Sequence, residues 1–293
     1  MAPMRPLLAS ARMSASTARA YGPSALGDDR RRFIELTMTL ARTEFKLRYF
    51  GSVLGYVWSL VRPLLFFGVL YVFFVEILQI SHGVPHFGSY LLTGIVLWNY
   101  FSEATSGCVN CLVQREGLLR KMRFPRMVIP LSVSLTAIFN LSLNFIVIVV
   151  YALLDGVTPT ARWLEMIPIA LGFVVFATGL GMLLSALYVR FRDVDPIWSV
   201  GVQAWFYASP IMYLASKYSH FGTGFSKVMM CSPPATLLAQ MGHSFIDPVA
   251  YPSAATAAYG YASVIIALAL IPTVFALGWW VFTHEAPRVA ENL

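Results

Sequence analysis

The chain has 293 residues, 58% of them hydrophobic and 12% charged, with a formal net charge of +7. Soluble domains average roughly 45–50% apolar and about 25% charged residues, so this composition excludes a soluble globular domain and indicates an integral membrane protein. The three cysteines, an odd number, exclude a disulfide framework. Cys108 and Cys111 have the spacing of a metal-binding pair, but no second Cys or His pair lies near them, so we interpret both as packing residues.

Four parts of different composition follow one another along the chain. The first is rich in Ala, Ser and Arg and lacks the unbroken apolar core of a secretory signal, so we expect a flexible tail. The second has helical periodicity, the third is apolar, and the last is short and polar. We expect the N-terminal tail at 1–29, a cytoplasmic interface helix at 30–48, the membrane domain at 49–285 and a cytoplasmic tail at 286–293.

The interface segment, RRRFIELTMTLARTEFKLR, is amphipathic when it is drawn as a helix. Arg31, Glu35 and Arg42 fall on one stripe, and apolar side chains fall on another. Such a helix lies along the inner leaflet, with its basic side chains toward anionic headgroups. The pattern fits both a simple membrane anchor and a docking site for a partner, and both interpretations stay open.

Six apolar segments are long enough to cross the hydrocarbon core of a bilayer, which takes about 20 residues of helix. The stretch 226–245 is also apolar, but Pro233 and Pro234 interrupt it, which favours short re-entrant or interfacial helices over a seventh span. The sequence therefore predicts an all-α membrane protein with six spans and re-entrant helices before the last one. The spans are expected at 53–77, 88–112, 127–153, 164–189, 196–214 and 258–282.

The distribution of positive charge orients these spans. Six spans place both termini on one side, and that side then holds all 21 Lys and Arg residues except Arg162, Lys217 and Lys227. The positive-inside rule makes it the cytoplasmic side. Because topology accounts for the positive charge, a nucleic-acid partner is not needed to explain it.

The ionisable groups at membrane depth are Arg62, Glu76 and Glu103, of which Glu76 lies near the outer end of its span. The stretch RYFGSVLGYVWSLVRPLLFFGVLYVFF at 48–74 carries Arg62, and the second span carries Glu103. Each lies about ten residues from the cytoplasmic end of its span, which is about 15 Å into the membrane. A charge at that depth costs at least about 2.5–3.5 kcal/mol, so the two are expected to be paired or to face water. We predict an intramembrane ion pair between Arg62 and Glu103.

Two inner loops carry features that could serve a partner. The loop QREGLLRKMRFPRMVIP is basic, and Pro125 ends any short helix in it. Topology explains its charge, while its compactness favours a short amphipathic helix that sits in a groove of another protein. In the loop RFRDVDP, Asp195 and Pro196 have the residue types of a helix start. Capping of the following helix and contact with a partner both remain open as roles of this loop.

Several functions are disfavoured because the sequence lacks the residues that their chemistry requires. The spans hold no chain of Asp, Glu or His for a proton relay and no internal repeat, which disfavours a secondary transporter. His82 and His86 lie in an outer loop with Gly and Pro between them, and we do not assign them a metal. No acidic or His groups converge as a membrane-embedded glycosyltransferase would require. The sequence also has no G-x-x-x-x-G-K-[ST] motif, so energy for uphill transport would come from a separate ATPase.

Three stretches together form a signature: YFGSVLGYVWSLVRPLL at 49–65, RFRDVDPIW at 190–198 and YASPIMY at 207–213. In this order and spacing they resemble permease subunits of type-2 ABC transporters that export polysaccharides. This Wzm- and KpsM-like group includes O-antigen, capsule, teichoic-acid and galactan exporters. The resemblance covers about residues 30–285 and is closest to mycobacterial galactan exporters. Arg62 is a departure, because many relatives have a small polar residue such as Asn before the proline.

The resemblance implies an assembly in the bacterial plasma membrane. A homodimer of six-span permeases would join two copies of a separate ATPase, which binds the ATP and Mg²⁺, so this chain would be a transport subunit without a cofactor. The segment 226–245 would match extracellular helices that cap the channel exit. Carried over by position, ATPase contact falls on the interface helix and inner loops, at Arg31, Glu35, Arg42, Glu116, Leu118, Leu119, Arg120, Arg192 and Asp193.

The implied cargo is a polysaccharide on a polyprenyl pyrophosphate. A glycan longer than the membrane is thick needs a wet channel whose wall binds it weakly, and aromatic rings offer flat faces to sugar C–H groups. Aromatic residues are also common in helix packing and at membrane interfaces. We predict channel-lining roles for Phe67, Tyr71, Phe74, Trp198, Trp205 and Tyr213.

The same cargo needs a site for its diphosphate near the cytoplasmic entrance. Arginine suits phosphate geometry, although positive-inside topology also places basic residues there. We predict this role for Arg42, Lys46, Arg48 and Arg62. A type-2 ABC permease for drugs or small lipids is the closest competing interpretation, since it shares the spans and the missing ATP site.

Overall fold

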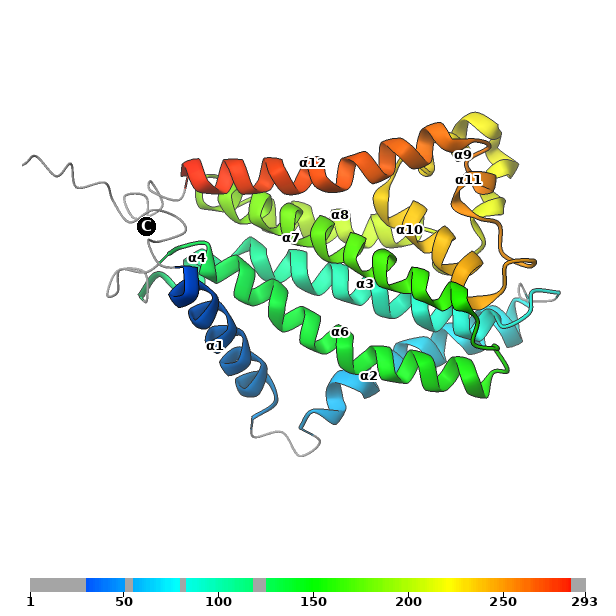
Figure 1. The fold of residues 1–293 in the computed structure, drawn as a ribbon, viewed down its shortest axis with the longest axis horizontal. Coiled ribbons are helices and arrows are strands. Elements are labelled where there is room, and N and C mark those ends of the chain that lie inside the picture. The colour runs from blue at the N-terminus through cyan, green and yellow to red at the C-terminus, as the bar shows by residue number, and fades with distance from the viewer. Residues whose placement is uncertain (1–29, 51–54, 80–82, 118–124, 286–293) are drawn as a thin grey trace, which may run out of the picture.

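The computed structural model describes residues 30–50, 55–79, 83–117 and 125–285, and every regular element within these ranges is helical (Figure 1). The fold is therefore all-α, as the composition predicted. The expected terminal tails and the Leu118–Arg120 part of the inner loop lie outside the described residues. The long helices are α1 (Arg30–Tyr49), α2 (Val57–Tyr71), α3 (Phe87–Val109), α6 (Val128–Leu154), α7 (Met166–Arg190), α8 (Val194–Ala208) and α12 (Tyr261–Glu285).

Helix α3 is the centre of the bundle. Its side chains are buried along most of its length, and it packs against α2, α6, α7 and α8 (Figure 1). The hydroxyls of Thr93 and Thr105 donate to the carbonyl oxygens of Ser89 and Phe101 one turn earlier, at 2.7 and 2.8 Å. These two buried hydroxyls are thus satisfied within the helix, as an apolar interior requires.

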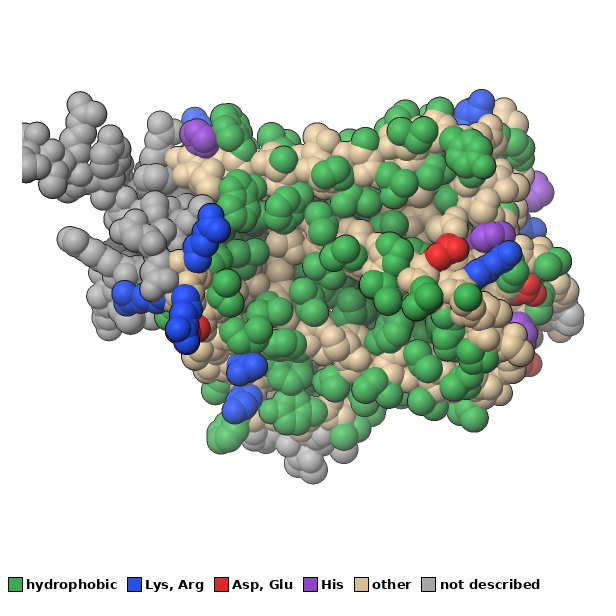
Figure 2. Space-filling view, viewed as in Figure 1, with side chains coloured by type: hydrophobic (Ala, Val, Ile, Leu, Met, Phe, Trp, Pro, Cys, Tyr) green, Lys and Arg blue, Asp and Glu red, His purple; other side chains and the backbone are tan. Residues whose placement is uncertain are grey.

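Four described segments are long and apolar enough to cross a membrane. Figure 2 shows apolar side chains over the middle of the molecule, with Lys and Arg gathered toward the end where α1 and α4 (Cys111–Gln114) lie. This arrangement is typical of an integral membrane protein with one basic face. The four segments are Val57–Ile77 (α2 and a π-helical turn), Val128–Leu154, Ala161–Arg190 (a 3₁₀ turn and α7) and Tyr261–Glu285.

The predicted second and fifth spans differ from these four. Helix α3 has 23 residues, about 34 Å, but carries more polar side chains. The fifth span, expected at 196–214, is a helix of 15 residues, Val194–Ala208, about 22 Å long. The expected range ran through Pro210, which has no N–H to continue a helix. Helix α8 is therefore shorter than predicted.

Tyrosine hydroxyls satisfy the carbonyl groups left open by the break after α8. Tyr90 of α3 donates to the carbonyl oxygen of Pro210 and, at 3.2 Å, to that of Tyr213. Tyr218 donates to the carbonyl oxygen of Ala208. Burial raises the pKa of the Tyr218 hydroxyl, which keeps it protonated as a donor. The YASPIMY stretch therefore encodes a helix end with its own hydrogen-bond partners.

The segment 226–245 forms two short helices and a π-helical turn. Helix α9 (Thr223–Met229) ends before Ser232, and α10 (Pro233–Met241) begins at a proline, where a missing N–H costs nothing. The turn Gly242–Ile246 follows. Helix α10 is buried against α7 and α12, and this group lies at the end of the molecule opposite α4 (Figure 1).

Helices α7 and α12 approach each other most closely at two glycines. A Cβ atom on Gly278 would overlap the carbonyl oxygen of Gly179, and one on Gly179 would overlap the backbone of Phe275. Small residues at such a crossing let two backbones touch, which is a main source of helix association in membranes.

We predict that Gly278→Ala destabilises the protein by about 1–3 kcal/mol, because the added methyl group has no space without separating the helices. Thermal unfolding of the purified protein in detergent measures the change. Gly224→Ala on α9 is the matched control, since its Cβ would meet no atom within 4 Å. Equal stability of Gly278→Ala and wild type would refute the close α7–α12 contact.

Candidate functional site

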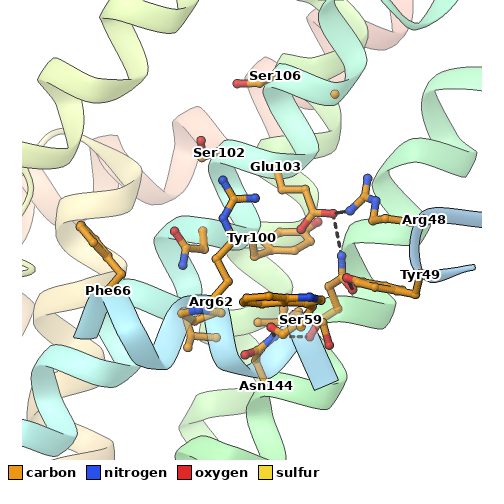
Figure 3. A pocket seen from close by; sticks show the side chains of 17 residues that line it. Arg48, Tyr49, Ser59, Arg62, Phe66, Tyr100, Ser102, Glu103, Ser106 and Asn144 are labelled. Atoms are coloured by element: carbon orange, nitrogen blue, oxygen red, sulfur yellow. Dashed lines mark hydrogen bonds and ion pairs between the residues drawn. The ribbon is translucent and has the colours of Figure 1, made fainter. Parts of the chain in front are cut away.

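A cavity of about 1100 Å³ lies where the end of α1 meets α2, α3 and α6 (Figure 3). Its wall is largely polar or aromatic, in contrast to the apolar outer surface of the bundle. Such a cavity offers water or a polar ligand a place inside the membrane domain. The lining residues include Arg48, Tyr49, Trp58, Ser59, Arg62, Phe66, Asn99, Tyr100, Ser102, Glu103, Ser106, Asn140 and Asn144.

Helical spacing places the polar lining residues on single faces. Asn99, Ser102, Glu103 and Ser106 recur at three- and four-residue intervals on α3, which puts them on one side of that helix. Asn140 and Asn144 do the same on α6. This stripe is a signal in the sequence, and the prediction that singled out Glu103 alone missed its polar neighbours.

Glu103 is held by side chains from two other helices. Its Oε1 forms an ion pair with Arg48 of α1 and accepts a hydrogen bond from Nδ2 of Asn140 at 2.7 Å. The hydroxyl of Tyr49 donates to Oδ1 of Asn140 at 2.9 Å. Asn144 donates to the carbonyl oxygen of Ser59 at 3.2 Å. The network joins α1, α2, α3 and α6 around one carboxylate.

Arg62 lines the same cavity but is not the partner recorded for Glu103. In Figure 3 its side chain points from α2 across the cavity toward α3. Among the described residues, the cation in ion-pair contact with Glu103 is Arg48. The predicted Arg62–Glu103 pair is corrected on this point, because α1 packs against α6 and places Arg48 of its last turn at the carboxylate. Two guanidinium groups and one carboxylate give the lining a formal excess of positive charge.

The four predicted headgroup residues divide into two pairs. Arg48 and Arg62 line the cavity, whereas Arg42 and Lys46 are exposed on α1 outside it. Helix α1 is fixed by contacts on its other face. Glu44 forms an ion pair with Arg115, and Thr136 of α6 donates to the backbone carbonyl of buried Ala41 at 3.3 Å.

Three of the predicted channel aromatics pack inside the subunit. Phe67 is 7% exposed, and its ring meets that of Tyr151 edge-on with centroids 5.2 Å apart. Nε1 of Trp198 donates to Thr105 at 3.2 Å, and Nε1 of Trp205 donates to Ser232 at 3.0 Å. These rings contact α3, α6 and the segment before α10, so the structure places them in the packing of the subunit.

The other three predicted aromatics are partly buried, as Trp198 and Trp205 also are. Tyr71 lies beside Phe67, Phe74 packs against the core, and Tyr213 donates its hydroxyl to the carbonyl oxygen of Tyr207 at 2.9 Å. The exposed rings on the same two helices and their π-helical extension are different ones: Trp58, Phe66, Phe73 and Tyr207. Phe67, Trp198 and Trp205 thus make contacts within the subunit, and the channel-lining role of the six predicted aromatics stays a prediction.

The predicted ATPase-contact residues that the structure describes are mostly accessible. Arg31 and Glu35 form an exposed ion pair at 3.0 Å one turn apart on α1. Arg42, Arg192 and Asp193 are exposed, and Glu116 is partly buried. Leu118, Leu119 and Arg120 lie outside the described residues. The assignment of these residues to a partner contact stays a prediction.

The cysteines of the α3–α4 region are buried among hydroxyl and carbonyl groups. Sγ of Cys108 lies 3.5 Å from the carbonyl oxygen of Pro130, and Sγ of Cys111 lies 3.4 Å from Oγ of Ser185. Within the described ranges, His, Cys, Asp and Glu side chains form no group of three that could hold a metal ion.

These features define a helical membrane domain with an apolar outer surface and a polar internal cavity, which is the architecture of a transport protein. Residues 35–239 match the model of the ABC-2 type transporter family, and the chain belongs to that family. The match confirms the resemblance found in the three signature stretches.

Three relatives are named as permease proteins of O-antigen export systems. An O-antigen export system permease protein RfbA of Klebsiella pneumoniae is 30% identical over 260 residues, 88% of this chain and 95% of the relative. A second RfbA from the same species is 28% identical over the same shares. The RfbA of Myxococcus xanthus is 32% identical over 178 residues, 61% of this chain and 68% of the relative.

The positions of two adjacent rings on α2 predict losses of stability of different size. Phe67→Ala removes a buried ring from its contact with Tyr151 and should cost about 3 kcal/mol. Phe66→Ala changes a ring that is 41% exposed and should cost less than about 1 kcal/mol. Thermal unfolding of both variants in the same detergent compares them. A larger loss for Phe66→Ala would contradict the assigned faces of α2.

Proposed function

We propose that this chain is the channel-forming permease of an ATP-driven exporter that moves a polysaccharide linked to polyprenyl pyrophosphate. Family membership supports a transport role, and the relatives named as O-antigen export permeases support a polysaccharide cargo. The substrate would pass from the cytoplasm across the bacterial plasma membrane. Galactan and O-antigen are the glycans we favour.

The observation that carries this proposal is the cavity with Arg48 and Arg62. Two guanidinium groups from different helices face a polar space of about 1100 Å³, which is large for a site that holds a diphosphate alone. Guanidinium groups bind phosphate oxygens through two parallel hydrogen bonds, and a partly enclosed site strengthens that attraction. Asn and Ser side chains on the same wall can bind hydroxyl groups of the first sugars.

The surface of α2 supports assembly with a second copy. Only Ser59, Pro63 and Phe67 of its 15 residues are buried within the subunit. We propose that α3 and α8 complete a set of six spans with cytoplasmic termini, and that two subunits enclose the channel. The exposed rings Phe66 and Tyr207 would then present flat faces to the sugar chain without binding it strongly.

A separate ATPase would supply the energy. The ABC-2 family assignment supports partnership with an ABC ATPase, and the basic end of the molecule offers α1 and the loop between α7 and α8 for contact. ATP and Mg²⁺ would bind to that partner. A permease for drugs or small lipids would use the same contacts, so the cargo decides between the two functions.

We predict that Arg62→Leu lowers the affinity of the assembled transporter for a polyprenyl pyrophosphate at least about tenfold, or about 1.4 kcal/mol. The loss follows from removing one of two phosphate-binding groups in the cavity. Equilibrium binding in lipid nanodiscs measures it, and cell-surface glycan in a strain dependent on the variant tests export. Lys217→Gln, an exposed change outside the cavity, is the control. Normal binding and export by a well-folded Arg62→Leu variant would overturn the headgroup site.

Stimulation of ATP hydrolysis separates polysaccharide export from drug or small-lipid export. We expect the reconstituted permease–ATPase complex to hydrolyse ATP faster with a lipid-linked glycan than with hydrophobic drugs, because the cavity wall is polar and cationic. The measurement is phosphate release at saturating ATP. Stimulation by drugs alone would favour the competing function.

A further inference from the structure

The cavity contains a negative charge that competes with the proposed ligand. Glu103 is the one carboxylate among the described residues that line it, and it already engages Arg48. The ion pair joins α1 to α3, so it is both a contact inside the site and a link between two helices. A diphosphate that binds Arg48 must meet this carboxylate.

The Arg48–Glu103 pair is accessible enough to exchange. The two side chains are 44% and 28% exposed, whereas both side chains of the Glu44–Arg115 pair on the same helix are 21% exposed. Solvent-accessible ion pairs contribute little to stability. A diphosphate carries more negative charge than one carboxylate and offers several oxygens to the guanidinium fork. Arg48 therefore has a stronger partner available in the proposed substrate.

Glu103 keeps its position without Arg48. Asn140 is buried and donates to Glu103 at 2.7 Å, and Tyr49 in turn orients the Asn140 amide by donating to its Oδ1 at 2.9 Å. The carboxylate is thus fixed at the cavity wall by a hydrogen bond that does not require the arginine. Its charge repels an incoming phosphate whether or not Arg48 has left.

We propose that Glu103 is an internal placeholder for the diphosphate of the substrate: it holds Arg48 in the empty site and yields it when the headgroup binds. This inference rests on the proposed function and concerns the same cavity. The exchange breaks the Arg48–Glu103 ion pair and forms ion pairs between Arg48 and phosphate oxygens, with no covalent step. Glu103 is a positioning residue, because it acts on the ligand through Arg48 and through its charge.

The exchange also changes what holds the end of α1. In the empty site this end is tied to α3 through Glu103, and after exchange it is tied to the ligand. The Glu44–Arg115 pair and the Thr136 contact hold the middle of the helix in both states. Binding of the ligand in the cavity therefore changes a contact of α1, which is the helix that we expect to contact the ATPase.

The test measures binding of geranylgeranyl pyrophosphate to the full permease–ATPase complex in nanodiscs. Glu103→Gln removes the competing charge while keeping a group that can bond Asn140, and we expect about tenfold tighter binding. Glu103→Ala is a second neutral variant in case Gln perturbs folding, and it should also bind more tightly. Glu44→Gln is the matched control, because it breaks an ion pair of α1 outside the cavity and should leave affinity unchanged.

The possible results separate the two proposals. Tighter binding by the Glu103 variants with unchanged Glu44→Gln supports the placeholder, and structural damage would not produce such a gain. If wild type binds in an Arg48-dependent way and the folded Glu103 variants bind equally or more weakly, the placeholder is overturned and the headgroup site stands. Equal tightening by Glu44→Gln would assign the effect to a loosened α1 and also overturn it. Absence of binding by wild type would overturn the headgroup site itself.

Discussion

Charge inside an apolar helical bundle has to be paired or hydrated, and the structure around Glu103 follows from that requirement. The carboxylate of this α3 residue draws Arg48 from α1 and Asn140 from α6. Arg62 of α2 faces the same space. Four helices thus converge on one polar site, and the cavity lies between them.

Helix α3 divides the molecule into a dense part and a hollow part. From Phe87 to Trp98 its side chains are all buried, and tyrosines close this part: Tyr90 stacks near Tyr251 with centroids 4.9 Å apart. From Asn99 onward polar side chains line the cavity. The dense part fixes the break after α8 through the Tyr90 hydroxyl. One end of the bundle is densely packed, and the basic end has the accessible cavity. This arrangement suits a protein that receives its ligand from the basic side.

Composition and apolar segments were sufficient to predict an all-helical membrane protein, and the three signature stretches were sufficient to recognise its family. Position along one helix also marked Glu103 as a charge that needs a partner. These sequence patterns did not predict the partner of Glu103, since Arg48 lies in the last turn of α1 and only the packing of α1 against α6 brings it to the carboxylate. They also did not predict the contacts that Phe67, Trp198 and Trp205 make within the subunit. In an apolar helix, no alternation of polar and apolar residues shows which aromatic side chains other elements cover. The contacts with Tyr151, Thr105 and Ser232 become visible only in the structure. The shortened α8 was readable from Pro210, whose missing N–H outweighs the apolar run around it.

The exposure of α2 limits what can surround it. Three of its 15 residues are buried in the subunit, so lipid or another protein must cover the rest. Lipid alone cannot cover the face that bears Arg62, because a guanidinium group in hydrocarbon is costly. That face, with Phe66 beside it, opens into the polar cavity instead, while a neighbouring face carries the exposed Leu65 and Val69. One helix therefore separates an aqueous space from an apolar one, as a helix at the wall of a passage through a membrane must do.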